Sequence, residues 1–485
     1  MKLSPALLPT TILRLVFCYC FLLLGGAAAG AIGAMAPSPP ERAGGEVNPP
    51  GFYDQPVTLQ LPAGARYTLD GSTPKADAPV AKEAIRITKT TAVRWQQFSD
   101  KGEPEGFPQG GTYLINEPDT RLLTLSVAID PWRLFDPVKG WYHAGPGADP
   151  GHWKQPGANW WTRRSHPAHV DLIETDGRCV FSATVDYRMF GGMSRIHPQK
   201  SFSLSARKAY GQHKIKHRLF GPEGPKSFQF LVARNAGSDW NRSYLRDALL
   251  TGLLEDESWD LDHQAARPVQ VYLNGRYWGI FHLREKINSQ FIADRHAIEE
   301  KDNIDLLEHQ ETVKHGQSAD YRKLVHFVET NDLSDPANYR RVQEWMDVDN
   351  YQRLQIAQTY FDNRDAGGNI RYWRDRTDPS SRWRWILYDV DQGFGLHDPE
   401  AYARNTVAFY TEANGPSWPN PPWSTLLQRR LLANPSYRRG FVNRSLDYLH
   451  TDFASEKVVL AIDERVAALE HDMPRQLRRW KGKEK

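Results

Sequence analysis

Residues 269–283 read VQVYLNGRYWGIFHL, and at this stretch the sequence changes from strand patterns to helical ones. Two runs rich in β-branched and aromatic residues, 269–273 and 277–283, flank Asn274-Gly275, a dipeptide that favours the tight turn between antiparallel strands. The stretch therefore predicts a β-hairpin. Strand-like runs precede it and mostly helical patterns follow it. A sheet-rich half followed by a helical half is typical of an α+β fold.

The sheet-rich half divides into two parts. Short strand-like runs from residue 51 to about residue 117 are regularly spaced and predict a small β-sandwich. A second set of runs begins at Leu122, with a hairpin around Asp176-Gly177. The runs predicted as strands are 57–61, 66–69, 85–98, 124–129, 170–173, 180–187, 201–206 and 228–233.

The second half carries apolar residues at helical spacing over 321–330, 339–360 and 426–480. Only 370–373 and 383–388 interrupt it as strands. An earlier helix is predicted from about Leu245 to Leu254, after a cap at Ser238 or Asp239. No repeat of fixed period is present.

The composition limits the class of protein. A chain of 485 residues corresponds to about three domains of ordinary size. Hydrophobic residues make up 40% and charged residues 25%, which favours a packed core over disorder. Lys and Arg number 61 against 58 Asp and Glu, and this balance argues against nucleic-acid binding. Of the three cysteines only Cys179 lies outside an apolar run near the start, so a disulfide scaffold is excluded.

Residues 1–36 have the features of a secretory leader. Lys2 and Arg14 supply positive charge, residues 15–24 are apolar, and residues 25–36 are mostly small, with Ala-x-Ala sites for cleavage. An uncleaved membrane anchor is the alternative. Residues 37–47, rich in Pro and Gly, predict a linker. No second long apolar run follows, so we expect an exported protein (periplasmic, cell-surface or secreted) with no stable membrane span once the leader is removed.

One candidate site lies at the paired glycines Gly191 and Gly192. Glycines between two strands allow backbone N–H groups to approach an anion, and Lys200 on the next strand could neutralise it. Ser194 and Arg195 lie between them. The alternative is a hairpin turn with a surface lysine.

Two further candidates lie in the helical half. Asp365 and Asn369 are four residues apart where glycines end a predicted helix, a pattern that suits metal binding or the orientation of a hydroxyl group. Asp389 and Asp391 follow an apolar strand and precede a glycine-rich turn, a combination that commonly holds a divalent cation. The alternatives are ordinary turn residues and a polar strand end.

The segment from Asn235 to Asp247 is the fourth candidate. A capped helix accounts for Ser238 and Asp239. On that helix, Arg246 and Asp247 could pair with sheet residues, including Lys200.

Taken in order, these segments resemble the CotH (spore coat protein H) kinase family over residues 121–485. The resemblance implies an atypical protein-kinase-like, two-lobed domain. Residues 48–118 separately resemble the chitobiase/β-hexosaminidase C-terminal domain, a small all-β, Ig-like sandwich, most clearly at YTLDGSTP (67–74). The stretches that match the CotH family are 191–201, 234–247, 271–285, 365–374 and 383–395.

The resemblance also assigns roles to residues and implies ATP and Mg²⁺ or Mn²⁺ as cofactors. Gly191, Gly192, Ser194 and Arg195 would cover the nucleotide phosphates, which Lys200 would contact. Asp365 would be the catalytic acid that orients the acceptor hydroxyl. Asn369 and Asp391 would bind the metal, with Asp389 a weaker candidate behind them. Either Asp247 or Glu285 would be the carboxylate partner of Lys200. Gln392 departs from the family, which usually has Phe there.

The function implied by the resemblance is transfer of a phosphoryl group from ATP to a hydroxyl group of an envelope or surface protein. Nucleotidyl transfer (AMPylation) on the same fold is one alternative. Another is a non-catalytic envelope or polysaccharide-binding protein, which would contact carbohydrate through the N-terminal sandwich. That alternative also draws on a group of tryptophans clustered within a few dozen residues: Trp132, Trp141, Trp153, Trp160 and Trp161.

Overall fold

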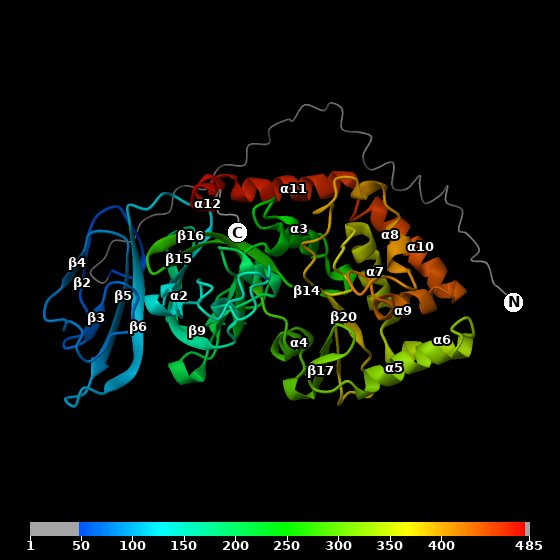
Figure 1. The fold of residues 1–485 in the computed structure, drawn as a ribbon, viewed down its shortest axis with the longest axis horizontal. Coiled ribbons are helices and arrows are strands. Elements are labelled where there is room, and N and C mark those ends of the chain that lie inside the picture. The colour runs from blue at the N-terminus through cyan, green and yellow to red at the C-terminus, as the bar shows by residue number, and fades with distance from the viewer. Residues whose placement is uncertain (1–47, 481–485) are drawn as a thin grey trace, which may run out of the picture. The chain divides into compact units, whose positions relative to one another are not determined.

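The computed structural model describes residues 48–480 (Figure 1). The predicted leader, residues 1–36, and the predicted linker, residues 37–47, lie outside this range. The described residues form two compact units. The barrel unit contains residues 48–252, 264–301 and 463–480, and the helical unit contains residues 253–263 and 302–462. Within 48–480, no helix is long and apolar enough to cross a membrane.

The N-terminal part of the barrel unit is all-β, as predicted. Its core is formed by residues that alternate along short strands, among them Leu59, Ile87, Val93 and Tyr113. One sheet has the order β1-β6-β5-β3, and β2 pairs with β4 in a second sheet. The strands are β1 (Gly51–Tyr53), β2 (Val57–Leu59), β3 (Arg66–Thr68), β4 (Ile85–Ile87), β5 (Thr91–Phe98) and β6 (Pro104–Ile115).

A closed barrel follows, in the strand order β10-β13-β16-β15-β7-β8-β9. Its neighbouring strands are antiparallel except β15 and β7, which are parallel and pair Val269 with Leu123. Because the sheet closes, it presents no open edge, and its apolar side chains line one continuous core. The strands are β7 (Leu123–Ala128), β8 (Ser165–Ile173), β9 (Cys179–Met189), β10 (Phe202–Ser205), β13 (Phe230–Arg234), β15 (Ala266–Leu273) and β16 (Arg276–Glu285).

Both predicted hairpins are confirmed. β15 and β16 join at Asn274 and Gly275, which both have positive φ angles, as a two-residue turn of this kind requires. β8 and β9 join across the turn that contains Gly177, also at positive φ. Cys179, at the start of β9, is a free thiol.

The β15–β16 turn and β8 connect the barrel to the N-terminal sheets. The Asn274 side chain accepts a hydrogen bond from the Ile129 N–H and donates one to the Ile129 carbonyl. Gly71 leaves space for this side chain, because a Cβ at position 71 would collide with it. Asp171 on β8 accepts hydrogen bonds from the Thr112 backbone N–H of β6 and from the Ser182 hydroxyl, both at 2.8 Å. A buried carboxylate therefore joins a strand of the sandwich to two strands of the barrel.

Two helices of the barrel unit are fixed by polar side chains. Asp239 accepts from the backbone N–H of Arg246, the first residue of α3, so the predicted acidic cap is present but acts from seven residues upstream. Near the C-terminus, the Gln476 side chain accepts from the Ile280 N–H of β16. The helices are α2 (Pro131–Phe135), α3 (Arg246–Gly252), α4 (Ser289–His296) and α12 (Met473–Trp480), and a small sheet joins β11 (Ile215–Lys216) to β12 (Ser227–Phe228).

The helical unit contains more sheet than its sequence predicted. Five strands pair in the order β14-β20-β19-β17-β18, where only β19 and β20 were expected. β17 pairs with β19 between Leu306 and Trp373, a contact across more than sixty residues of chain. The strands are β14 (Asp262–His263), β17 (Ile304–Glu308), β18 (Thr312–His315), β19 (Arg371–Asp375) and β20 (Arg384–Leu387).

The long helical patterns are divided into shorter helices. Residues 339–360 form parts of two helices, because Asp347 caps a new helix by accepting from the Asn350 N–H. Residues 426–480 contribute to four helices. α11 (Ser455–Glu470) has residues in both units. The helices of the helical unit are α5 (Ala319–Thr330), α6 (Pro336–Trp345), α7 (Val348–Phe361), α8 (Thr406–Tyr410), α9 (Pro422–Leu431) and α10 (Pro435–His450).

Asp171 provides a test of the contact between the sandwich and the barrel. We expect Asp171→Ala to lower the free energy of unfolding by about 3 kcal/mol, because it leaves the buried Thr112 N–H without an acceptor and removes the buried carboxylate next to His169. Urea denaturation measures the change. Asp176→Ala, in the exposed turn of the same hairpin, is the matched control and should change stability by less than about 0.5 kcal/mol. Equal effects of the two substitutions would contradict this account.

Candidate functional site

Lys200 is buried two residues before β10, with 2% of its surface exposed. Its Nζ donates to the backbone carbonyl of Arg195 at 2.7 Å and to that of His197 at 3.0 Å. The ammonium group also lies 4.2 Å from the centre of the Trp160 ring. Burial lowers the pKa of Lys200 to about 7. The alternative of a surface lysine is therefore wrong: this lysine closes the loop that contains Gly191 and Gly192.

The loop over Lys200 is held by two polar side chains. Arg195 donates to the carbonyls of Gly191, Trp160 and Thr162, and burial lowers the pKa of its guanidinium to about 10. Asn235, which follows β13, is buried and donates to the carbonyl of Gln199. The loop thus owes its shape to Arg195 and Asn235.

The glycines of this loop differ. Gly191 has φ of +96°, and a Cβ there would lie 2.5 Å from the Ser194 hydroxyl, so only glycine suits the position. Gly192 faces open space, where a Cβ would meet no atom within 4 Å. The backbone at Gly192 is accordingly open to close approach by a ligand. The structure brings Gly191, Gly192, Ser194, Arg195 and Lys200 together in one loop.

The two carboxylates considered as partners of Lys200 are engaged by arginines. Asp247 on α3 forms a buried ion pair with Arg284 of β16 and lies 3.6 Å from Arg234 of β13. Glu285 pairs with Arg295 of α4 at 2.9 Å. Asp247 thus pairs with sheet residues, as expected, and these residues are arginines.

In the helical unit, Asp365 and Asn369 are in direct contact. α7 ends at Phe361, and the loop that follows returns Asn369 to Asp365, whose Oδ2 accepts from the Asn369 Nδ2 at 2.9 Å. Asn369 Nδ2 also donates to the backbone carbonyl of Asp389, just after β20. Burial raises the pKa of Asp365, and the negative charge of Asp389 raises it further.

Asp391 lies in the turn that follows β20 and is buried. The strand before it is as apolar as predicted, with Trp385 and Leu387 fully buried. Gln392, next to Asp391, donates to Asp365 Oδ2 at 3.3 Å. Gln392, where the family usually has Phe, therefore makes a polar contact with the predicted catalytic acid.

Trp418 is a neighbour of Asp365 that the sequence did not reveal. Its indole N–H donates to Asp365 Oδ1, although 55% of the side chain is exposed. The loop that carries it packs closely on the next glycine after Asp365, since a Cβ at Gly367 would lie 2.1 Å from the carbonyl of Pro419. Residues 413–422 read ANGPSWPNPP, and this composition predicts only a loop.

The polar groups around Asp365 suit a hard divalent cation, which prefers carboxylate and amide oxygens. The Asn369 side chain uses its nitrogen in both of its hydrogen bonds, so its oxygen is available as a ligand. Gln392 Oε1 is buried and has no hydrogen-bond partner among the described residues. Within residues 48–480, no three His, Cys, Asp or Glu side chains converge as a metal cluster. Asn369 and Asp391, the metal ligands that the resemblance implies, supply an amide and a carboxylate, groups that Mg²⁺ accepts as ligands together with water.

The predicted group of tryptophans does not form one surface. Trp141 and Trp160 are buried, whereas Trp132 and Trp153 are about half exposed. Trp160 instead lies against Lys200. At least two of the five are thus core residues rather than part of an aromatic platform.

These features define an α+β protein with a lysine buried beneath a glycine loop in one unit and a carboxylate–amide loop in the other. The family model described as CotH kinase protein matches residues 187–485, more than half of the chain. The chain therefore belongs to the CotH kinase protein family. The model for the chitobiase/β-hexosaminidase C-terminal domain matches residues 48–107, within the N-terminal sheets. No curated protein matches the chain significantly.

The buried Lys200 makes stability depend on pH. Its pKa is about 7 in the folded protein and about 10.4 in the unfolded chain, so the unfolded state binds the extra proton between these values. The free energy of unfolding should therefore rise as the pH increases from about 7 to about 10. Below pH 7 Lys200 is charged in both states, so the full cost of burying its charge lowers the stability.

Lys200→Met, which keeps an apolar stem of similar length, should lose this dependence and be more stable than the wild type at pH 6. Urea denaturation at a series of pH values measures the difference. If the free energies of unfolding of the wild type and the variant changed equally with pH, burial would not lower the pKa of Lys200.

Proposed function

We propose that this protein is a metal-dependent kinase that transfers the γ-phosphoryl group of ATP to a hydroxyl group of a protein acceptor. Membership of the CotH kinase protein family supports the class of reaction. The observation that carries the assignment of residues is the contact between Asp365 and Asn369 beside the turn with Asp391. Predicted export makes an envelope or surface protein the proposed acceptor.

Asp365 would take the proton of the acceptor hydroxyl. The acceptor oxygen forms a bond to the γ-phosphorus, the bond from that phosphorus to the bridging oxygen breaks, and ADP leaves. Hydrogen bonds from Asn369, Gln392 and Trp418 hold the Asp365 carboxylate in one orientation. A bound Mg²⁺ or Mn²⁺ would neutralise charge on the phosphates, and Asn369 and Asp391 are its proposed ligands.

On the nucleotide side, Lys200 would hold the phosphates beneath the loop of residues 191–195. Arg195 donates to three backbone carbonyls, so we propose that it shapes the loop rather than binds phosphate itself. The open backbone at Gly192 supports a close approach of phosphate oxygens.

Labelled ATP tests the reaction. With Mg²⁺ or Mn²⁺, we expect the wild type to transfer label from the γ-phosphate to itself or to added protein. Asp365→Ala and Asp391→Ala should each reduce the rate at least about a hundredfold. Asp378→Ala, in an exposed turn of the same unit, is the control and should retain full activity. Transfer that survives both test substitutions would refute the assignment of these residues.

The same assay separates the alternatives. Incorporation of label from the α-phosphate instead would identify nucleotidyl transfer. A protein that neither transfers label nor gains thermal stability from ATP with metal would be non-catalytic, because a ligand of the native state must stabilise it.

Lys200 predicts a proton linkage for nucleotide binding. A phosphate group near the ammonium favours the charged form, so binding of ATP should raise the pKa of Lys200 above about 7. At pH 8 the wild type should take up a proton when ATP and Mg²⁺ bind. Calorimetry in buffers of different ionisation enthalpy measures this uptake. Binding by Lys200→Met with the same uptake would exclude Lys200 as the phosphate ligand.

A further inference from the structure

The Asp365 carboxylate has one position left for a hydrogen bond from an acceptor. Its Oδ2 already accepts from two amides, that of Asn369 at 2.9 Å and that of Gln392 at 3.3 Å. Within residues 48–480, its Oδ1 accepts from the indole N–H of Trp418 alone. Each carboxylate oxygen has two lone pairs, so the free one belongs to Oδ1. A hydroxyl group that gives its proton to Asp365 would therefore approach Oδ1, next to Trp418.

The space beside Oδ1 is open to an acceptor. Asp365 is partly exposed. Gly368 lies next to this oxygen, and a Cβ at position 368 would be only 2.8 Å from Oδ1. The glycine therefore leaves space where a larger residue would crowd the oxygen that receives the proton.

Trp418 presents an apolar surface at this same place. Its indole N–H, the one polar group of the side chain, is bonded to Asp365, yet 55% of the side chain is exposed. The exposed part therefore consists of carbon atoms. A single exposed apolar side chain is ordinary on a protein surface. This one differs because it is bonded to the oxygen that the acceptor must reach.

The loop that carries Trp418 has its shape before an acceptor binds. Asn420 is buried and donates to the carbonyl of Phe409 at 3.0 Å and to the carboxylate of Glu412 at 2.9 Å. A Cβ at Gly415 would lie 2.2 Å from the Asn420 carbonyl, so two parts of the loop are in close contact. Little conformational freedom would be lost when another side chain packs on the indole, which favours binding.

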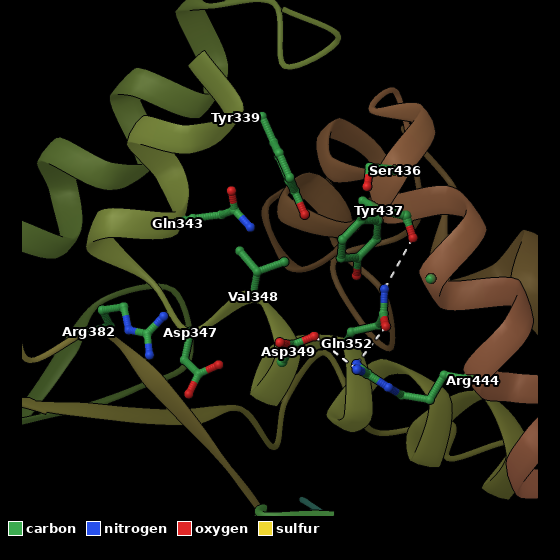
Figure 2. A pocket seen from close by; sticks show the side chains of 11 residues that line it. Tyr339, Gln343, Asp347, Val348, Asp349, Gln352, Arg382, Ser436, Tyr437 and Arg444 are labelled. Carbon is green, nitrogen blue, oxygen red and sulfur yellow. Dashed lines mark hydrogen bonds and ion pairs between the residues drawn. The ribbon is translucent and has the colours of Figure 1, made fainter. Parts of the chain in front are cut away.

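A cavity of about 270 Å³ in the helical unit is too far away to take part in this recognition (Figure 2). It is lined by Val348 and Gln352, in the first turns of α7, whereas Asp365 follows the last residue of that helix, Phe361. α7 has 14 residues and is therefore about 20 Å long. About six residues of extended peptide span that distance. The residues next to the acceptor hydroxyl must be recognised elsewhere.

We propose that Trp418 determines the specificity for the acceptor, and that its ring packs against an apolar side chain next to the hydroxyl that receives the phosphoryl group. This inference rests on the proposed function, because it takes Asp365 as the acid that binds that hydroxyl. The indole N–H positions Asp365, and the ring binds the acceptor.

The reach of a peptide and the charge of the site both fit an apolar neighbour. Consecutive residues of a peptide are about 3.8 Å apart, so the side chain beside an acceptor serine or threonine reaches the indole. Removing two apolar surfaces from water favours their contact. The negative charge of Asp389 acts on Asp365 and would also oppose an acidic side chain beside the acceptor.

Two substitutions separate the roles of the N–H and of the ring. Trp418→Phe keeps a ring but loses the N–H, so kcat should fall about tenfold while the KM for the acceptor peptide changes less than about twofold. Trp418→Ala should lose kcat to a similar extent, and its KM for the peptide should also rise about tenfold, because the ring contact is lost. The KM for ATP should stay the same in both variants.

The substrates are peptides with a single serine or threonine, in which the residues on either side are leucine, glycine, lysine or aspartate. We expect the wild type to favour leucine over glycine about tenfold in kcat/KM, and Trp418→Ala to lose this preference. Trp153→Ala is the matched control, because Trp153 is 58% exposed but lies in the barrel unit. It should retain the preference. Thermal unfolding checks that each variant is folded.

The outcomes distinguish this inference from the proposed function. A preference for leucine that survives in Trp418→Ala, a rise in the KM for ATP instead of the peptide, or a wild type that favours aspartate or lysine would each overturn the inference and leave the kinase activity established. Absence of transfer to every peptide would also overturn it. If label from the γ-phosphate reached neither a peptide nor the protein itself, the proposed function would be refuted as well.

Discussion

The barrel unit depends on the closure of its seven-stranded sheet by the parallel pairing of β7 with β15. These strands are separated by more than a hundred residues, and their pairing completes a ring in which every strand has two neighbours. β9 and β10, which are neighbours in this ring, hold the two ends of the loop in which Lys200 is buried beside Trp160. Burial lowers the pKa of Lys200, and two backbone carbonyls and an aromatic ring offset part of the cost of burying the cation. The ring thus anchors the glycine loop, and the surroundings of Lys200 come from that loop and from Trp160.

In the helical unit, the Asp365 carboxylate is likewise held by groups from several segments. Asp365 is approached by side chains from its own loop, from the turn after β20 and from the loop before α9. Three N–H donors favour its ionised form, while burial and Asp389 oppose it, and the net effect is a raised pKa. A cation placed among these groups would reverse that balance.

Much of the fold could be predicted because it depends on local signals. The turns at Asn274-Gly275 and Asp176-Gly177 require positive φ, and the residues that tolerate it are recognisable. The strand 384–387 was recognisable from its run of apolar residues. β17 and β18 were not, because their composition is mixed, and β19, the other partner of β17, lies far along the chain. The division between α6 and α7 was also missed, since the apolar spacing continues across Asp347 and only the cap ends it.

The sequence by itself determined which chemical groups stand at each turn: a lysine after paired glycines, an aspartate four residues before an asparagine, and acids after an apolar strand. Those groups sufficed to indicate the family. Their surroundings were decided only by tertiary structure. Asp247 pairs with Arg284, and Trp418 bonds Asp365 across 53 residues. Pattern and spacing describe neighbours along the chain, whereas burial and hydrogen bonding depend on residues brought together by long-range strand pairing and helix packing.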